Sequence, residues 1–330
     1  MDNILEVKDL NIDIVDNGSI KSLVENVSFN VKRKGSLGIV GESGCGKSIT
    51  ALSIMQLLSY PLKASRGEII YRDGDKQIEL REANKGVMRK IRGKEISMIF
   101  QEPMTALDPL FTIEEQIGEV LEIHTDLRKS EIRKLVLEML DKVGIPQPER
   151  IMKNYPHQLS GGMLQRVVIS MALILNPKLI IADEPTTALD VTIQAQILEL
   201  INDLRSSYDT SIIMITHDLG VIAETCEDVI VFYAGQIVEQ GSVIDIFHNT
   251  AHPYTRGLIS AVRSLGDKDT ELFTIAGTVP LAGEFGKGCR FADRCSQALP
   301  ICSEREPELV EISASHKSKC WLYNGGDTSD

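Results

Sequence analysis

The residues that could do chemistry begin at Gly41, where the sequence reads GESGCGKS as far as Ser48. This is the P-loop pattern G-x-x-x-x-G-K-[ST], with an apolar run before it (residues 37–40) and a helix-like segment after it (residues 50–58). Glycines at this spacing let successive backbone N–H groups turn toward one anion, and the following helix adds its positive end. The alternative is a glycine-rich turn with an incidental lysine. The flanking strand and helix favour a site for nucleotide phosphates.

Two adjacent side chains of this loop have distinct predicted roles. Lys47 would reach the β- and γ-phosphates as a point charge, and the Ser48 hydroxyl would ligate the bridging Mg²⁺. We expect Cys45 to have a lowered thiol pKa and to be alkylated fast, because it lies near a helix N-terminus and Lys47. The predicted ATP contacts of the loop are Ser43, Gly44, Cys45, Gly46, Lys47, Ser48 and Ile49.

A pair of carboxylates, Asp183 and Glu184, ends the apolar run of residues 179–182. Such a strand places an acid at the carboxyl edge of a sheet, beside a P-loop. Asp183 would then hold magnesium through water, and Glu184 would orient or deprotonate the water that attacks the γ-phosphate. The alternative is two solvated acids at a strand end.

Ser160, Gly161 and Gly162 precede a helix-like run at residues 164–175. Like the P-loop, they place a hydroxyl and unpaired backbone N–H groups at a helix N-terminus, an arrangement that can bind phosphate. Taken alone the signal is weak, because the serine can be a plain N-cap. His217, which follows the apolar run of residues 212–215, would by itself be read as an ordinary strand-end residue.

Composition limits the classes of protein that this chain can be. Its 330 residues are 43% hydrophobic, as in a globular protein of one or two domains, and its net charge of −12 repels nucleic acid and anionic lipid. The longest apolar run, residues 167–175, is far shorter than the roughly 20 residues that span a bilayer. The first ten residues contain no run like a signal peptide. We expect a cytosolic protein that meets a membrane only through protein contacts and has no nucleic-acid partner.

The spacing of apolar residues predicts an α/β fold. Four runs that are apolar throughout, as in strands buried on both faces, alternate with helical segments: residues 96–100, 179–182, 212–215 and 229–232. A mostly parallel sheet with helices on both faces is the economical architecture. Residues 4–40 alternate apolar segments with turns and predict an antiparallel β flank.

Helix signals divide the rest of the chain. Between residues 103 and 159 the pattern is helical, with Ser130 expected as an N-cap and Gly144 as a helix end, and Asp190 is expected to cap a later helix. After residue 250 the alternation stops. We therefore predict an ATPase domain at residues 1–250, with a helical insertion at about 103–165, and a small irregular extension at 251–330.

Taken in order, these motifs resemble those of ABC-transporter ATPases, over about residues 4–245. The resemblance rests on residues 41–48, 101, 159–163, 181–185, 188–190 and 217. It implies a P-loop NTPase of ABC type, in which two nucleotide domains enclose two ATP molecules head to tail. Two departures are Met163, where the common signature has glutamine, and the lack of an aromatic at residues 11–28 to stack on adenine, where Ile20 is the candidate substitute.

The resemblance also assigns roles residue by residue. Ser160, Gly161 and Gly162 would contact the ATP of the partner subunit. Gln101 would contact magnesium and the attacking water, and His217 would contact the γ-phosphate. The implied catalytic residues are Glu184, His217 and Gln101, and the implied Mg²⁺ ligands are Ser48, Gln101 and Asp183.

Three strings, at residues 155–163, 182–196 and 252–255, are similar to the ATPase subunits of bacterial dipeptide and oligopeptide importers. This implies a second ABC ATPase subunit in a heterodimer, two transmembrane permease subunits and, indirectly, an extracytoplasmic peptide-binding protein. The chain would lie at the cytoplasmic face of the cell membrane. Nickel and glutathione importers share these strings, so the cargo stays open. A soluble ABC ATPase outside transport and a small-molecule kinase with the same P-loop are the rival functions.

Four cysteines crowd into the predicted extension: Cys289, Cys295, Cys302 and Cys320. Cytosolic thiols stay reduced, so the crowding indicates a metal rather than disulfides. The spacings are unlike the tight pairs of structural zinc sites, whereas four thiolates suit an iron–sulfur cluster. Family members with such an extension are similar in being associated with a 4Fe–4S centre. Zinc and unligated thiols are the alternatives.

Overall fold

The computed structural model describes residues 2–16, 19–187, 190–266 and 275–323. Ala188 and Leu189, from the motif at 188–190, lie outside the described residues. The chain forms two compact units: unit 1 contains residues 1–32, 36–82 and 214–330, and unit 2 contains residues 33–35 and 83–213. Unit 2 is therefore inserted into unit 1 along the sequence.

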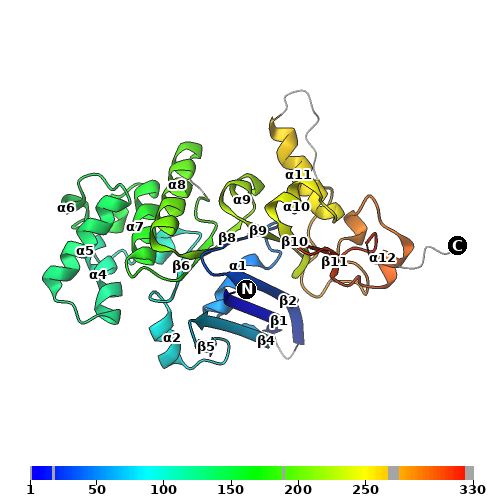
Figure 1. Ribbon diagram of the computed structural model, residues 1–330, viewed down its shortest axis with the longest axis horizontal. Helices are drawn as coiled ribbons and strands as arrows, with labels where there is room; N and C mark the ends of the chain where they lie inside the picture. The colour runs from blue at the N-terminus through cyan, green and yellow to red at the C-terminus, as the bar shows by residue number, and fades with distance from the viewer. Residues whose placement is uncertain (1, 17–18, 188–189, 267–274, 324–330) are drawn as a thin grey trace. The chain divides into compact units, whose positions relative to one another are not determined.

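Unit 1 begins with a four-stranded antiparallel sheet, in the order β2-β1-β4-β5 (Figure 1). Its strands are β1 (Asn3–Asp16), β2 (Ser19–Lys32), β4 (Leu62–Asp73) and β5 (Lys76–Glu79). Along β2, Val27, Phe29 and Val31 are buried and alternate with exposed residues, which is the pattern of a sheet with one face in the core. The antiparallel flank predicted for residues 4–40 is confirmed.

The second sheet of unit 1 supports the P-loop. Five neighbouring strands of this larger sheet belong wholly to unit 1. In sheet order they are β11 (Val310–Ser313), β12 (His316–Ser318), β10 (Gln236–Ser242), β9 (Asp228–Tyr233) and β3 (Ser36–Val40). β3 and β9 are parallel, and the other neighbouring pairs are antiparallel. Every residue of β3 is buried, so this strand lies inside the core and holds the start of the P-loop rigidly. The strand predicted at residues 229–232 is confirmed.

The described residues of unit 1 also form helical segments. They are α1 (Lys47–Ile54), α9 (Leu219–Thr225), α10 (Val243–His248), α11 (Pro253–Gly266), η2 (Ala292–Arg294) and α12 (Pro300–Glu304). The extension holds more regular structure than its sequence predicts, because β12 pairs with β10 and Phe291 packs on Tyr233 and Tyr254, at centroid distances of 5.2 and 5.4 Å. Shared strand pairing and aromatic packing order a segment that lacks periodic apolar residues of its own.

Unit 2 contains a parallel strand pair and most of the helices. The strands are β6 (Ile96–Ile99) and β7 (Leu179–Asp183), with Ile96 opposite Leu179. The helices are α2 (Lys85–Ile91), α3 (Pro103–Ala106), α4 (Ile113–His124), α5 (Lys129–Lys142), α6 (Pro148–Ile151), η1 (Pro156–Gln158), α7 (Gly161–Leu173) and α8 (Val191–Tyr208). The chain passes from unit 2 to unit 1 within β8 (Ser211–Thr216). The strands predicted at residues 96–100, 179–182 and 212–215 are confirmed.

Local side-chain contacts fix the helix ends. Asp190 caps α8, since its carboxylate accepts the Ile193 N–H at 3.0 Å, as predicted. Gly144 ends the α5 segment with φ +72°. Ser130 is not the N-cap of α5, and this prediction is wrong: the helix begins at Lys129, after Arg128. The Glu131 carboxylate accepts the Arg128 N–H at 2.8 Å, so the first turn is closed by an acid at the third position rather than by a hydroxyl.

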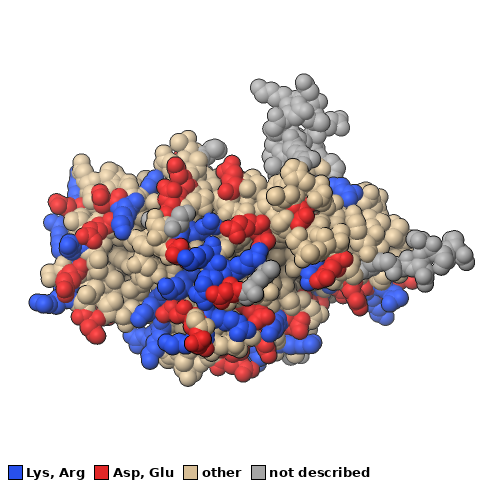
Figure 2. All heavy atoms as spheres, in the orientation of Figure 1, with Lys and Arg blue, Asp and Glu red and all other residues tan. Residues whose placement is uncertain are grey.

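Figure 2 shows basic and acidic side chains intermixed over α4 and α5. Two ion pairs belong to these helices: Arg133 with Glu114 at 2.7 Å, and Lys134 with Glu138 at 3.8 Å. Exposed pairs of this kind contribute little to stability but leave no field of one sign on this face of the two helices. No helix among the described residues combines the length and the apolar character needed to cross a bilayer.

A buried polar cluster joins β10 to the extension. Glu239 on β10 is fully buried, and its carboxylate accepts the N–H groups of Ala251 and His252, at 2.7 and 3.0 Å, and contacts His316 Nε2 at 2.8 Å. His252 accepts the Tyr254 N–H on Nδ1, at 3.1 Å. A buried charge of this kind must be fully paired, so the cluster ties α11 and β12 to the same strand.

Acid should weaken this connection through His252. Burial lowers the pKa of His252 to about 4 from 6.5. The unfolded chain takes up a proton below pH 6.5 while the folded one does not, so stability present above pH 6.5 is lost as the pH falls toward 4, by about 3 kcal/mol. We expect the difference in unfolding free energy between wild type and His252→Asn to shrink over this range in urea titrations. Exposed His248→Asn is the control, and a pH-independent difference for His252→Asn would contradict the prediction.

Candidate nucleotide site

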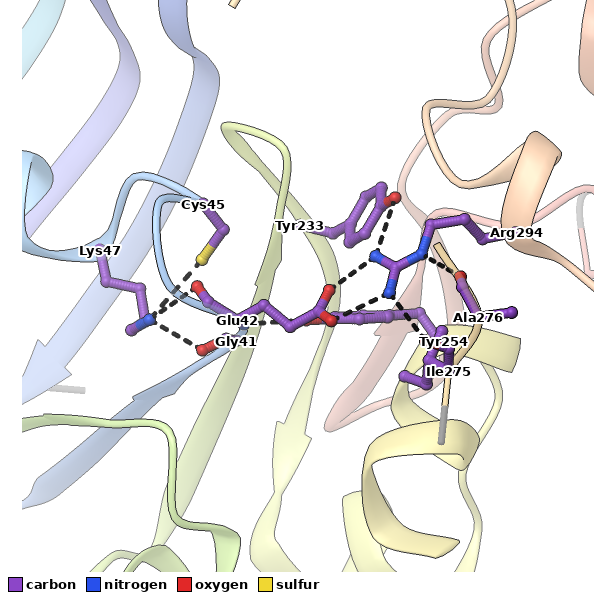
Figure 3. Close-up of polar contacts among 9 residues, drawn as sticks. All are labelled: Gly41, Glu42, Cys45, Lys47, Tyr233, Tyr254, Ile275, Ala276 and Arg294. Carbon is purple, nitrogen blue, oxygen red and sulfur yellow. Dashed lines mark hydrogen bonds and ion pairs between the residues drawn. The ribbon is translucent and has the colours of Figure 1, made fainter. Parts of the chain in front are cut away.

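Residues 41–46 form a loop that only glycine can follow at two positions (Figure 3). A Cβ on Gly41 (φ +152°) would lie 2.3 Å from the Phe232 carbonyl oxygen on β9 and 2.8 Å from Cys45 Sγ. Gly46 has φ +109° and stands at the N-terminus of α1. A side chain at Gly41 would collide with β9 and Cys45, and Gly46 has a backbone that side chains disfavour, so the loop keeps this course only with glycine. Backbone N–H groups at the N-terminus of α1 suit the phosphates of a nucleotide.

Lys47 is held at the centre of this loop. Its ammonium donates to the carbonyl oxygens of Gly41, at 2.8 Å, and of Glu42, at 3.0 Å, and the residue is only 4% exposed. Partial negative charges on the loop therefore stabilise a buried cation next to the helix N-terminus. A cation in this position can attract an anionic ligand through charge-assisted hydrogen bonds.

Cys45 does not have the lowered pKa expected from the sequence. The residue is 1% exposed, and burial raises the pKa of its thiol, against the opposing effect of Lys47, whose ammonium lies 3.8 Å from Sγ. Desolvation disfavours the thiolate more than one neighbouring cation favours it. The prediction of a lowered pKa is therefore wrong, and slow alkylation is the expectation from the structure.

The carboxyl ends of β6 and β7 bring two predicted residues together in unit 2. Gln101 Nε2 donates to Glu184 Oε2 at 3.1 Å, and the Thr187 hydroxyl donates to the same oxygen at 2.7 Å. Asp183, the last residue of β7, is buried, and Glu184 follows it with φ +46°. A left-handed backbone at a residue with a side chain costs free energy. Two donors thus hold the Glu184 carboxylate in one orientation.

Thr187 is a site residue that no sequence motif identified. Its signal was a hydroxyl three residues after Glu184, within a turn that starts at Glu184: the Thr187 N–H donates to the Glu184 carbonyl oxygen at 3.2 Å. Hydroxyls at this spacing commonly bond back to the residue that opens a turn.

Ser160 stands at the N-cap position of α7, as predicted, but its side chain makes no capping hydrogen bond. A plain capping role is therefore absent. Gly162 packs closely against α8, since a Cβ there would lie 3.0 Å from Ile193 Cγ2. The Ser-Gly-Gly segment leaves a hydroxyl and helix N–H groups at one end of a 13-residue helix.

The predicted site residues are divided between the two units. The P-loop and His217 belong to unit 1, and Gln101, residues 160–162, Asp183 and Glu184 belong to unit 2. His217 is exposed between β8 and α9, where the Asp218 carboxylate caps the helix through the Gly220 N–H, at 2.8 Å. Ile20 on β2 is 69% exposed. It is therefore accessible to a ligand, and its predicted contact with adenine stays a prediction.

The four cysteines of the extension fit a metal by chemistry but not by arrangement. Burial raises the pKa of the Cys289 thiol to about 11, and the Cys289 N–H donates to the Cys302 carbonyl oxygen at 2.7 Å, so these two cysteines are in contact through their backbones. Within the described residues, which include all four, no group of three or more His, Cys, Asp or Glu side chains could hold a metal ion. The predicted 4Fe–4S cluster, and its zinc alternative, are thus not supported by this geometry.

Two family models match the chain. The model described as "ABC transporter" matches residues 24–187, and the model described as "Oligopeptide/dipeptide transporter, C-terminal region" matches residues 238–302. The first match contains the P-loop and Glu184, and the second contains Cys289, Cys295 and Cys302. Cassette and extension are therefore recognised separately.

Relatives of nearly the same length match almost the whole chain. It is 50% identical over 326 residues to the "Probable peptide ABC transporter ATP-binding protein" of Sinorhizobium fredii, over 98% of this chain and 96% of that protein. It is 47% identical to two proteins of Bacillus subtilis: the oligopeptide transport ATP-binding protein AppD, over 98% of both chains, and the dipeptide transport ATP-binding protein DppD, over 98% and 96%.

A solved structure shares the fold. It is an ATP-binding cassette dimer in a post-hydrolysis state bound to ADP and Pi, with a TM-score of 0.64 and 30% identity, over 72% of this chain and 98% of that one. The predicted fold class is confirmed. Because relatives that are about half identical cover almost every residue, and because the ABC transporter model matches the stretch that contains the P-loop, the chain belongs to the family of ABC transporter ATPases.

Proposed function

We propose that this chain is the ATPase subunit that powers import of dipeptides or oligopeptides across the bacterial cytoplasmic membrane. The observation that carries the proposal is that one chain matches both the cassette model and the oligopeptide/dipeptide transporter C-terminal model. Full-length relatives with peptide transport names support it. A nickel or glutathione importer remains the second candidate for cargo.

Each site residue has a proposed role in ATP hydrolysis. The loop N–H groups of residues 43–49 and the Lys47 ammonium bind the phosphates, and His217 contacts the γ-phosphate. Magnesium, when bound, neutralises charge that develops on the phosphates. Its proposed protein ligands are Ser48, Gln101 and Asp183.

Glu184 is the proposed acceptor of the proton from the attacking water. Gln101 and Thr187 both donate hydrogen bonds to its Oε2, and these two bonds fix the orientation of the carboxylate. Ser160, Gly161 and Gly162 would contact the ATP of a partner subunit. The Ser160 hydroxyl, which makes no capping hydrogen bond to its own helix, would donate a hydrogen bond to that ATP.

The proposed partners are a second, different ATPase subunit, two permease subunits and, through them, an external peptide-binding protein. The chain would sit peripherally on the cytoplasmic face of the membrane. In this scheme residues 1–250 hydrolyse ATP and residues 251–330 form the extension. Closing of the ATPase pair on ATP, and its opening after hydrolysis, would switch the permease between outward-facing and inward-facing states.

Transport assays with the assembled complex test this proposal. The chain is co-expressed with tagged permease subunits from its genomic neighbourhood, purified, and reconstituted into vesicles with the binding protein. We expect co-purification, and ATPase activity stimulated by a loaded peptide-binding protein. Stimulation by nickel or glutathione with no response to peptides would reassign the cargo, and failure to bind any permease would favour an ATPase outside transport.

We further propose that Cys289, Cys295, Cys302 and Cys320 hold a 4Fe–4S cluster that stabilises the extension. The four thiols supply the donor chemistry, and the backbone hydrogen bond between Cys289 and Cys302 keeps two of them close. Burial raises the pKa values of the Cys289, Cys295 and Cys320 thiols, a desolvation cost that metal binding would relieve. Cluster assembly would require these side chains to move into a ligand arrangement.

Anaerobic purification tests the cluster. Wild type should contain iron and acid-labile sulfide, and Cys302→Ser should lose both. Proteases should cleave the extension of Cys302→Ser faster than that of wild type, whereas the rate of ATP hydrolysis should change less than the rate of cleavage. Cys226→Ser, outside the extension, is the matched control. Stoichiometric zinc without sulfide, or full iron in Cys302→Ser, would overturn the assignment.

A further inference from the structure

An arginine of the extension reaches directly into the P-loop. Arg294, at the end of η2, donates from Nη1 and Nη2 to the two carboxylate oxygens of Glu42, at 2.7 and 2.9 Å (Figure 3). Glu42 is the second residue of the P-loop, and 252 positions separate the pair along the chain. A bidentate pair of this kind fixes the orientation of both partners as well as their separation.

The guanidinium is locked on its other sides too. Nε donates to the Ala276 carbonyl oxygen at 2.8 Å, Nη2 also approaches the Ile275 carbonyl oxygen at 3.4 Å, and Nη1 approaches the Tyr233 hydroxyl at 3.4 Å. The Arg294 side chain is only 6% exposed. Its hydrogen bonds to Glu42 raise the pKa of Arg294, so the cation is permanent. Removing Glu42 would leave a buried charge without its carboxylate.

Glu42 is held through its backbone as well. Its N–H donates to the hydroxyl of Tyr254 on α11 at 2.9 Å, and Tyr254 is fully buried. The carbonyl oxygen of Glu42 accepts from the Lys47 ammonium at 3.0 Å. One residue therefore connects the extension, through side chain and amide, to the lysine proposed to bind the phosphates.

We propose that Arg294 is a positioning residue for nucleotide binding: by clamping Glu42 it holds the P-loop in the conformation that receives phosphates. The extension thereby sets the ATP affinity of the cassette. This inference rests on the proposed role of the P-loop in binding ATP. Without the clamp the loop must be ordered by the nucleotide itself, and that entropic cost appears as weaker binding.

Binding and kinetic measurements on a mutant cycle test the clamp. The variants are Arg294→Gln, Glu42→Gln and the double variant, in the full chain, with a fluorescent ATP analogue for Kd and phosphate release for KM and kcat. Each single variant should raise Kd and KM by about tenfold, the scale of a lost charge-assisted pair. The double variant should resemble either single one, because both remove the same contact. The value of kcat at saturating ATP should change far less.

Arg290→Gln is the matched control for a purely structural role. Arg290 is also 6% exposed, but it joins the extension to the Glu25 carboxylate on β2 and to the Ala234 carbonyl oxygen, and it has no hydrogen bond to Glu42. It should loosen the extension in thermal melts and leave Kd unchanged. An equal loss of ATP affinity in Arg290→Gln would overturn the clamp, as would additive effects in the mutant cycle.

Two further variants keep the outcomes separate. Arg294→Lys keeps the charge but cannot make the bidentate contact, so its Kd should fall between those of wild type and Arg294→Gln. Lys47→Ala reports on the P-loop itself. If Lys47→Ala binds ATP normally, the proposed nucleotide site fails. If Lys47→Ala loses ATP while Arg294→Gln and Glu42→Gln bind it as wild type does, only the clamp fails.

Discussion

Glutamine in place of Glu184 should stop steady-state ATP hydrolysis while ATP binding survives. The amide has nearly the same shape but cannot accept a proton from water, and a positioned general base contributes about 10²- to 10⁴-fold. The P-loop, the Lys47 cation and Asp183 are untouched. Phosphate release should therefore fall by at least this factor, with Kd for ATP close to that of wild type.

Thr187→Val is the companion variant for Glu184. It removes one of the two hydrogen bonds to Glu184 Oε2, at 2.7 Å, and leaves the carboxylate in place. A loss of about tenfold in kcat is expected, smaller than for Glu184→Gln, because orientation is impaired and the base is kept. Turnover near wild type in Glu184→Gln would contradict the role of this carboxylate.

Alanine in place of Lys47 should impair nucleotide binding itself. The change removes the one full positive charge at the centre of the loop and leaves the carbonyl oxygens of Gly41 and Glu42 without their donor. The loss should be about 10- to 100-fold in Kd, as for a charge-assisted contact to phosphate in a partly desolvated site. Isothermal titration with a slowly hydrolysed ATP analogue measures it.

Lys34→Ala is the matched lysine control. Lys34 pairs with Asp209 at 2.6 Å, but both side chains are more than half exposed, so the pair should matter little. Equal ATP affinity in Lys47→Ala and Lys34→Ala would remove Lys47 from the binding site.

Local signals made much of the fold predictable. The apolar runs that form β6, β7, β8 and β9 are buried on both faces. A strand of this kind can be recognised from its own sequence without knowledge of the neighbouring strands. The P-loop could be recognised because its glycines, lysine and serine are spaced within eight consecutive residues, although the atoms that a Cβ on Gly41 would meet include the distant Phe232 carbonyl oxygen. Asp190 could be assigned as a cap because its partner lies three residues away.

Features that depend on distant partners could not be predicted. The pKa of Cys45 is set by burial under residues remote in sequence, so the nearby Lys47 and helix N-terminus gave the wrong sign. β12 is ordered by its pairing with β10, and no local pattern in the sequence predicts that pairing. The contact between Arg294 and Glu42 joins residues far apart in the chain, and neither residue is unusual in its own neighbourhood. The prediction of Ser130 as an N-cap was wrong for a local reason. The Glu131 carboxylate accepts the Arg128 N–H, so α5 begins before Ser130.

The insertion of unit 2 into unit 1 has a consequence for folding during synthesis on the ribosome. β3 pairs with β9, which is made roughly 190 residues later, about 10 to 40 s at ordinary rates of translation. During that delay residues 83–213 emerge, whereas the edge of β3 that pairs with β9, buried in the finished protein, is still without that partner. We expect nascent chains at this stage to be prone to aggregation through this open strand edge. A translation product that stops before β9 would also lack the strand against which Gly41 of the P-loop packs.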